Sequence, residues 1–426
     1  MQTEVYKDTE TNTSSENEVT FNHNKVASSI LNRNQIIYIE EQDAFYIYKD
    51  NYYQKFRVGQ IGKEIKRVVG NKFSKHTQAE VINSLKADAI IKFEDLNSSS
   101  LLNLKNGLFD IASETLIPHS PQVKSTIRLN VSYNKDAKCP KWRKAISEIL
   151  EDEGKISVFQ EYCGLCLTKE TRYAKALFLI GEGANGKSTL LALLEHILTS
   201  LNVSSIPLEM LKNNNYVANL FNKLVNISFE TNSKSEVYDA TFKSIVTGDL
   251  MTADAKYGHP FDFRPYCKLI YALNNMPRVS DKTLSFYRRL LILRFNKTFE
   301  GASDNKGLKE ELLTELDGIF LWCLEGLRNL RQRGDFKPTE EMEREVKDYQ
   351  RENNAVLVFA EEKCNIDPKA STTKQILYDT FKIWCEENGH KPASQRHFTN
   401  DLKKAYPSLK DGRTEEARFL EGICLK

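Results

Sequence analysis

One short glycine-rich segment, residues 181–188, limits what this chain can fold into more than any other part of its sequence. The segment reads GEGANGKS and fits the pattern G-x-x-x-x-G-K-[ST] of phosphate-binding loops. An apolar run precedes it at 176–180, and a stretch with leucines at three- and four-residue spacing follows at 189–199. A chance glycine loop would lack this context. The sequence therefore predicts a strand, a phosphate-binding loop and a helix in that order, as in nucleoside triphosphatases.

The residue types inside the loop suit contacts with a triphosphate. Gly181 and Gly186 allow backbone torsions that a side chain would forbid, so the backbone amides can face the phosphates. Lys187 is predicted to contact the β and γ phosphates of ATP, and Ser188 to coordinate Mg²⁺. The full set of predicted nucleotide-binding residues is Gly181, Glu182, Gly183, Ala184, Asn185, Gly186, Lys187, Ser188 and Thr189.

Length and charge bound the architecture. For 426 residues we expect two or three domains, and a net charge of +2 means that any nucleic-acid contact must be local. No apolar run is long enough for a membrane span, and the polar, acidic N-terminus is unlike a secretory signal, so we expect a soluble, cytoplasmic protein with no membrane partner. The eight cysteines are expected to be reduced, and the pair Cys163 and Cys166 fits packing better than a metal or redox site.

Changes of pattern along the chain predict four regions. Residues 1–100 read as a polar, disordered start followed by a small antiparallel meander and helices. Residues 101–170 read as short strands and then a helical domain. Residues 171–335 alternate apolar runs with helical stretches, which predicts an α/β core with a mainly parallel sheet and ends in a helix over 307–333. Residues 336–426 read as a charged connector helix and a small C-terminal domain.

Two further strand-like stretches end in polar residues suited to nucleotide hydrolysis. The stretch 223–229 is followed by Glu230, which we expect to position magnesium or to polarise the attacking water. The stretch 268–273 is followed by Asn274, which we expect to hold that water or to sense the γ-phosphate, with Asn275 as the second choice. A solvated glutamate in a loop and an asparagine turn before proline are the alternative interpretations.

An arginine pair precedes a fourth strand-like stretch at 291–295. Arg289, with Arg288 as the second candidate, is expected to reach the γ-phosphate bound by a neighbouring subunit and to stabilise transition-state charge. That role requires an oligomer whose active sites lie between protomers. The alternative is an ordinary salt-bridging residue at the surface.

These elements, in this order and at this spacing, resemble the superfamily III helicases, and most closely the phage and plasmid primase-helicase group that also includes the poxvirus primase-helicase. The resemblance extends to LKNGLFD at 104–110, PHSP at 118–121, CPKW at 139–142, QEYCG at 160–164, TGD at 247–249 and KY at 256–257. It implies an AAA+-like core, ATP and Mg²⁺ as cofactors, and a hexameric ring around DNA. It also implies a hairpin that points into the channel, where Lys256, and less strongly His259, contacts a DNA phosphate. A solvated lysine is the alternative.

Two features depart from the pattern of the resembled family. The acidic strand of the relatives commonly ends in two adjacent acids, whereas here Phe229 takes the first position and only Glu230 remains. The relatives often carry an N-terminal primase domain, whereas residues 1–100 hold no zinc-ligand cluster and no convincing set of catalytic carboxylates. We therefore expect ATPase activity from this chain but no primase activity.

The C-terminal domain shows a helix at 372–387, a second helix at 394–406 and a hairpin over 409–425 around Asp411-Gly412. Two helices and a hairpin predict a winged helix, and the resembled family often ends this way. The predicted DNA-binding residues here are Arg396, Lys403, Lys404 and Arg413. Because the local excess of positive charge is small, protein docking is the alternative role.

The combined prediction is an ATP-dependent DNA helicase that acts as a ring in the replication of a phage, plasmid or other mobile genetic element in a bacterial cell. Single-stranded DNA would lie in the channel and duplex or origin DNA would bind the C-terminal domain, with a separate primase or polymerase as a further partner. The first alternative is an initiator that binds and melts an origin without processive unwinding. The second is a metabolic P-loop kinase, against which the arginine pair and the C-terminal domain argue.

Overall fold

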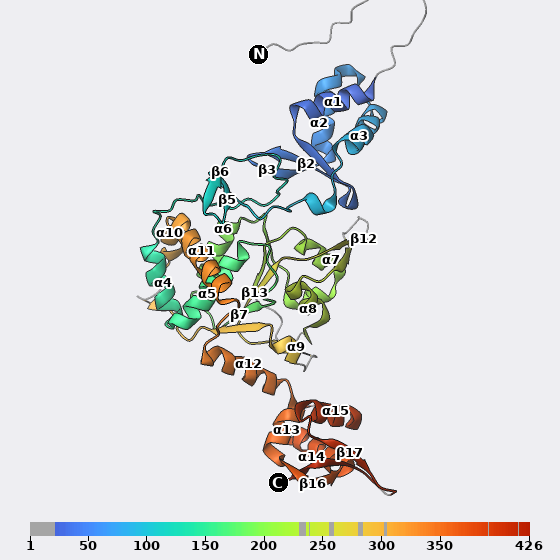
Figure 1. Ribbon diagram of the computed structural model, residues 1–426, viewed down its shortest axis with the longest axis vertical. Coiled ribbons are helices and arrows are strands. Elements are labelled where there is room, and N and C mark those ends of the chain that lie inside the picture. Colours follow the sequence, from blue (N-terminus) through green and yellow to red (C-terminus); the bar gives the residue numbers. More distant parts are fainter. Residues whose placement is uncertain are drawn as a thin grey trace, which may run out of the picture. The chain divides into compact units, whose positions relative to one another are not determined.

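The computed structural model describes residues 22–229, 236–237, 239–254, 260–279, 284–301, 305–390, 392–415 and 417–426 (Figure 1). They form two compact units. The first comprises the described residues up to Ser98 together with Ser120–Thr126, and the second comprises Ser99–His119 and Ile127–Lys426. Within these ranges, no helix is long and apolar enough to cross a membrane.

The first unit is a three-stranded antiparallel meander with helices packed against it, and the meander agrees with the prediction. Its elements are α1 (His23–Arg33), β1 (Ile36–Ile39), β2 (Ala44–Lys49), β3 (Tyr52–Phe56), α2 (Val58–Val69) and α3 (Lys75–Ala89), with 3₁₀ turns at Glu40–Gln42, Gly70–Lys72 and Phe93–Asp95. In its core, Ile30 of α1, Ile65 of α2 and Leu85 of α3 pack with Phe45 and Phe56 of the sheet. The three helices therefore turn their apolar faces inward and their polar faces outward.

The second unit starts with a small antiparallel sheet and a helical layer. Its first elements are β4 (Leu102–Leu104), β5 (Gly107–Asp110), β6 (Thr115–Ile117), α4 (Pro140–Leu150) and α5 (Glu153–Cys166). The single helix predicted over 307–333 is wrong, because the chain forms α10 (Leu308–Leu313) and α11 (Leu316–Arg333) instead. At the break, the Glu315 carboxylate accepts hydrogen bonds from the backbone N–H groups of Lys141 (3.3 Å) and Trp142 (3.0 Å). The interruption thus supplies an anionic cap for the N-terminus of α4.

Helices α5 and α11 approach each other closely at small residues. A Cβ placed on Gly326 would lie 2.6 Å from the carbonyl oxygen of Gln160, and one on Gly164 would collide with Cys323 and Leu327. This helical layer and one face of the central sheet share a single hydrophobic core. Cys163 and Cys166 are free thiols buried in that core, where burial raises the pKa of both.

The central sheet has five parallel strands, which are β7 (Ala176–Ile180), β8 (Val203–Ser204), β9 (Val225–Phe229), β13 (Lys268–Leu273) and β15 (Leu290–Arg294). Their spatial order is β15–β7–β13–β9–β8. β7 and β13 lie inside the sheet and every residue in them is buried, which explains why their sequences are apolar apart from Lys268 at the start of β13. Helix α6 (Lys187–Leu198) follows the glycine loop. The predicted strand–loop–helix unit and the mainly parallel sheet are confirmed.

Short elements surround the sheet: the 3₁₀ turns Leu208–Lys212 and Ala218–Leu220, α7 (Asn214–Val217), β10 (Glu236–Val237), α8 (Asp239–Thr247), β11 (Met251–Asp254), β12 (Pro260–Phe263), β14 (Arg278–Val279) and α9 (Leu284–Tyr287). Strands β11 and β12 pair in antiparallel fashion, with Asp254 opposite Pro260. Two strands therefore pair where the resemblance implies a hairpin. The segment between them, which includes Lys256 and His259, lies outside the described residues.

The C-terminal part runs through α12 (Glu340–Glu352), α13 (Ala355–Lys363), β16 (Cys364–Thr373), α14 (Lys374–Glu387), α15 (Gln395–Ala405), β17 (Lys410–Arg413) and β18 (Arg418–Leu425). Its antiparallel sheet has the order β16–β18–β17. After α12, the sequence helix–strand–helix–helix–strand–strand is the arrangement of a winged helix. The two predicted helices and the strand pair are present, together with α13 and β16, which we did not predict.

The hairpin turn predicted at Asp411-Gly412 is wrong. Both residues lie within β17, and the connection to β18 comes after Arg413. A side chain at position 412 would collide with the ring of Phe419, which lies opposite on β18. This glycine therefore permits close packing between two strands instead of forming a turn.

Candidate functional site

The glycine loop joins the carboxyl end of β7 to the first turn of α6, as the sequence predicts. Gly186 precedes α6 with φ at +85°, a conformation that favours glycine. A Cβ at this position would also lie 2.8 Å from the side chain of Ile149 on α4. A Cβ on Gly181 would lie 2.7 Å from the carbonyl oxygen of Phe295. A larger residue at either position would collide with these neighbours, so glycine is needed at both for the loop to pack this closely.

The side chain of Lys187 folds back over the loop that precedes it. Its ammonium donates hydrogen bonds to the carbonyl oxygens of Gly181 (2.6 Å) and Glu182 (3.0 Å) and to Oδ1 of Asn185 (3.0 Å). Asn185 is itself buried and donates to the same Glu182 carbonyl. Burial lowers the pKa of Lys187. Among the described residues its polar partners are neutral oxygens, so no carboxylate compensates this charge.

A cavity of about 670 Å³ opens above the loop. Ser188 lines it and is exposed. Asn274 lines it as well, directly after the last residue of β13. The structure therefore brings the predicted Lys187, Ser188 and Asn274 to one place, at the carboxyl edge of the parallel sheet. Glu230 lies outside the described residues, but Phe229, its neighbour at the end of β9, lines the same cavity.

Several lining residues come from elements that we did not connect with the site. Helix α4 contributes Lys141, Lys144 and Glu148, and the region of α10 contributes Asn305 and Glu311. These side chains give the rim both positive and negative charge. They lie far from the loop in sequence, and of the five only Lys141 belongs to a motif named above, CPKW at 139–142. In the sequence, the spacing of the two lysines and the glutamate shows that they share one face of a helix. It does not show which part of the protein that face lies against.

The segment after β15 closes the cavity from another side. The backbone N–H of Phe299 donates to the carbonyl of Ala184 in the loop (2.7 Å), and the ring of Phe295 lies 5.9 Å from the Lys187 ammonium. Phe299 also lines the cavity. The loop is thus enclosed between α4 and the segment that follows β15.

The arginine pair lies at the opposite edge of the sheet from this cavity. Arg289 directly precedes β15, and its carbonyl accepts a hydrogen bond from the N–H of Ala176 at the start of β7 (2.8 Å). Its guanidinium donates to the carbonyl of Ser285, and the carbonyl of Arg288 accepts from Lys175 (2.7 Å). The structure therefore separates the two arginines from Lys187 of the same chain.

Helix α12 is attached both to the strand beside the loop and to the segment after Asn274. Arg294, the last residue of β15, forms two hydrogen bonds with the Glu345 carboxylate (2.7 and 2.6 Å), which raises the pKa of the arginine. The buried Lys155 pairs with Glu341 (2.8 Å). On the other side, the Tyr349 hydroxyl donates to the carbonyl of Pro277 (2.5 Å). Helix α12 is therefore joined both to the end of β15 and to the segment that follows β13.

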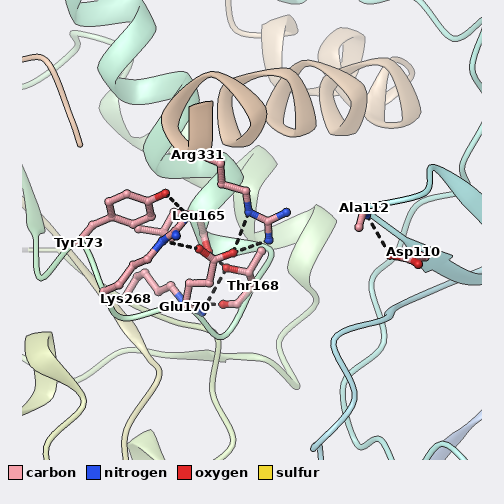
Figure 2. Close-up of polar contacts among 9 residues, drawn as sticks. Asp110, Ala112, Leu165, Thr168, Glu170, Tyr173, Lys268 and Arg331 are labelled. Atoms are coloured by element: carbon pink, nitrogen blue, oxygen red, sulfur yellow. Dashed lines mark hydrogen bonds and ion pairs between the residues drawn. The ribbon is translucent and has the colours of Figure 1, made fainter. Parts of the chain in front are cut away.

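A buried lysine fixes the amino end of β13. Figure 2 shows Lys268 beside the turn that carries Thr168 and Glu170, with Arg331 of α11 reaching Glu170. The Lys268 ammonium donates to the carbonyls of Thr168 and Tyr266. Burial lowers the pKa of Lys268 to about 8. The strand that precedes Asn274 is thereby tied at its start to the segment just after α5.

The predicted DNA-binding residues of the C-terminal part lie on α15 and at the end of β17. Arg396 and Arg413 are exposed. Lys403 instead pairs with Asp411 of β17 (2.7 Å), which also pairs with Lys374 (2.7 Å). Hydrogen bonds from Lys374 and Lys403 hold the pKa of Asp411 below its usual value. Lys404 lies 3.7 Å from Asp401. The structure thus neutralises part of the positive charge that the sequence assigns to this helix.

Three protein families match parts of the chain. A family described as "D5 N terminal like" matches residues 11–151, a "Family of unknown function (DUF5906)" matches 179–289, and a family described as "Poxvirus D5 protein-like" matches 351–419. The "Putative helicase L207/L206" of Acanthamoeba polyphaga mimivirus is 25% identical over 295 residues, which cover 66% of this chain and 30% of that protein. The "Putative helicase 022R" of Frog virus 3 (isolate Goorha) is 23% identical over 177 residues, which cover 37% and 18%. The chain spans less than a third of either relative.

Solved structures of the NrS-1 C terminal region share the fold. One apo structure matches with a TM-score of 0.57 at 14% identity and covers 93% of this chain and 98% of that one. A second, of residues 305–718 of that protein, matches with a TM-score of 0.58 at 12% identity and covers 94% of this chain and 99% of that one. The predicted α/β architecture is confirmed. The chain carries D5-type segments at both ends of a P-loop core, and its predicted resemblance to the group that includes the poxvirus protein is confirmed.

Proposed function

We propose that this chain is the ATP-dependent motor of a DNA helicase that works as a ring in the replication of a phage, plasmid or other mobile genetic element. The cavity where Lys187, Ser188 and Asn274 converge carries the proposal. The viral relatives named "Putative helicase" support the same class of activity. A bacterial cytoplasm as the location, and a separate primase or polymerase as partner, belong to the same proposal.

The cavity fits a nucleoside triphosphate. Its volume of about 670 Å³ lies within the range of small-molecule sites. The Lys187 ammonium has only neutral oxygens as polar partners among the described residues, so a phosphate would offer it a stronger, charge-assisted hydrogen bond. The exposed Ser188 hydroxyl suits Mg²⁺, which takes most of its ligands from phosphates and water. When bound, Mg²⁺ would neutralise charge on the β and γ phosphates.

Each remaining predicted residue has one role in this proposal. Glu230 orients or activates the attacking water, and Asn274 contacts the γ-phosphate or that water. Arg289 reaches the nucleotide of the neighbouring copy, with Arg288 as the second candidate, and the location of the pair away from Lys187 supports a role between copies. Lys256, with His259, contacts a DNA phosphate in the ring channel.

A second candidate function, origin recognition without processive unwinding, is favoured by the winged-helix arrangement of the C-terminal part. Its exposed Arg396 and Arg413 lie on the helix and strand that such modules turn toward DNA. A footprint on one repeated DNA sequence that disappears on deletion of residues 355–426 would favour this function.

Substitutions at Lys187 and Lys256 test the proposal together. Lys187→Ala should abolish both ATP hydrolysis and strand displacement on a forked DNA, because no other side chain supplies the cation in the loop. Lys256→Ala should keep ATP hydrolysis but lose strand displacement. Phosphate release and displacement of a labelled strand are measured side by side with the mass of the assembly in solution. A monomer whose ATPase ignores single-stranded DNA would contradict the helicase proposal.

A further inference from the structure

The first unit carries a dense run of positive charge along its second helix and into the start of its third. Residues 57–76 contain six Lys or Arg and a single acid, Glu64, although the whole chain has a net charge of only +2. We propose that this surface binds the phosphate backbone of a nucleic acid, in addition to the DNA contacts proposed above. We call it the α2 basic face and define it by Arg57, Lys63, Lys66, Arg67 and Lys75.

Three of these cations share one side of α2. At about 100° per residue, Lys63, Lys66 and Arg67 fall within about 100° of one another around the helix. They lie opposite the stripe formed by Ile61 and Ile65, which are fully buried in the core of the first unit. All three cations are exposed. The core thus fixes the orientation of α2 so that these charges face away from it.

Four of the five charges of this face have no acidic ion-pair partner among the described residues. Arg67 pairs with Glu64 (3.1 Å), but no acidic side chain in the described ranges pairs with Arg57, Lys63, Lys66 or Lys75. The second unit differs, because many of its cations have acidic partners. Its pairs include Arg143–Glu325, Lys155–Glu341, Arg294–Glu345, Arg331–Glu170 and Arg333–Glu161. The α2 basic face is therefore an area of uncompensated charge.

Helix stability does not account for this arrangement. Arg57 is the N-cap of α2 and Lys75 is the first residue of α3, and a cation at a helix N-terminus is disfavoured by the helix dipole. Neither helix has an acidic residue in its first turn. Lys63 and Arg67 are like charges at i and i+4, which also disfavours the helix. Lys66 and Arg67 in the last turn of α2 are the favourable exceptions. An external anion would compensate these costs.

The chemistry of the face favours a polynucleotide over a lipid surface. A membrane-binding helix needs an outward apolar face, whereas the apolar stripe of α2 is buried inside its own unit. The helix has 12 residues, so it spans about 18 Å, which matches about five nucleotides of one strand at duplex spacing. Phosphate contacts of this kind carry no sequence information, so binding at this face is independent of base sequence.

Binding of labelled oligonucleotides to the full chain tests the proposal. Single-stranded DNA, duplex DNA and single-stranded RNA are compared by fluorescence anisotropy over a range of salt concentrations, without nucleotide. For the triple variant Lys63→Gln/Lys66→Gln/Arg67→Gln we expect at least about tenfold weaker binding near 0.1 M salt, and a salt slope smaller by about 2 on single strands. The oligonucleotide that loses most identifies the nucleic acid bound.

A matched control separates the site from net charge. The triple variant Lys25→Gln/Arg33→Gln/Lys49→Gln removes the same charge from exposed positions of the same unit and should bind within about twofold of the unaltered chain. Equal losses in the two triple variants, or no loss in either, would overturn the proposal. So would retention on anionic lipid vesicles without binding to any oligonucleotide.

One further variant guards against misfolding of the triple variant. Glu64→Gln removes the only acid of the segment and should tighten oligonucleotide binding a few-fold, and unchanged or weaker binding would count against the proposal. The same binding titrations can be repeated with each variant combined with Lys187→Ala, because oligonucleotide binding needs no ATP hydrolysis. A failure of the helicase proposal would therefore leave the result for the α2 basic face unchanged, and the reverse also holds.

Discussion

Mixing two inactive variants tests whether the arginine pair acts between copies of the chain. In the parallel pair of β15 and β7, Leu290 lies opposite Ala176 and Arg294 opposite Ile180. Arg289 precedes the first of these pairs and the glycine loop follows the last. The four residue-to-residue steps between these two pairs span about 13 Å, before the depth of the loop is added. Arg289 therefore cannot reach a phosphate held by Lys187 of its own chain.

The expected magnitudes follow from this geometry. Removal of an arginine that stabilises transition-state charge lowers turnover by about 10³- to 10⁵-fold, so Arg289→Ala and Lys187→Ala should each be inactive alone. In a mixture, a shared site is intact where the loop of an Arg289→Ala copy meets the arginine of a Lys187→Ala copy. With random assembly at equal amounts, about one quarter of the sites meet this condition.

Steady-state phosphate release with saturating ATP and single-stranded DNA measures the recovery. Activity should rise and fall with the mixing ratio and be highest at equal amounts. The matched control mixes Lys187→Ala with Asn274→Ala, which line the same cavity of the same chain and should show no recovery beyond the sum of the two. Absence of recovery at every ratio, with both variants still assembled, would refute the argument that the site is shared.

Two further predictions concern stability. Gly326→Ala should lower the free energy of unfolding of the second unit by about 1–3 kcal/mol, because its methyl group would meet the Gln160 backbone. A Cβ on Gly59 of α2 would have no atom within 4 Å, so Gly59→Ala should instead stabilise the first unit by about 0.5–1 kcal/mol. Thermal unfolding measures both variants, and a lower unfolding temperature for both would contradict the packing argument. For Lys268, the folded pKa of about 8 lies below the unfolded value of 10.5, so the unfolded state binds more protons between them and stability rises with pH in that interval. Measured by denaturant titration relative to Lys268→Met, the free energy of unfolding of the unaltered chain should rise by up to about 3 kcal/mol from pH 8 to 10.5. A difference between the two proteins that does not change with pH would contradict the lowered pKa of Lys268.

Local patterns in the sequence were sufficient for most of the core. The apolar run 176–180, the loop and the leucine spacing after it predicted β7, Gly181–Ser188 and α6, because strand and helix periodicity are properties of neighbouring residues. The same reasoning placed Asn274 at the end of a strand. Because the strands are parallel, their carboxyl ends meet at one edge, which explains why Asn274 and Lys187 line the same cavity although they are far apart in the sequence.

Local patterns failed where a distant contact outweighs local preference. The leucine-rich stretch 307–333 reads as one helix, yet it breaks so that Glu315 can cap α4, more than 170 residues away. Asp411-Gly412 reads as a turn, yet Gly412 lies in a strand because the Phe419 ring covers it. In both cases the deciding partner is remote in sequence, so periodicity and turn propensity contain no information about it.

By itself, the sequence determined most strands and helices of the α/β core, and it identified the phosphate-binding loop, because these depend on residues within a few positions of one another. Only the tertiary structure decided that α4 and the region of α10 line the cavity above the loop, that α12 is joined to β15 through Arg294 and Glu345, and that Arg289 lies away from Lys187. These features depend on how a folded chain brings distant segments together. For the same reason the lysines of α15 and α2 differ. Lys403 of α15 pairs with an acid, whereas Lys63 and Lys66 of α2 pair with none in the part of the chain that the structure describes.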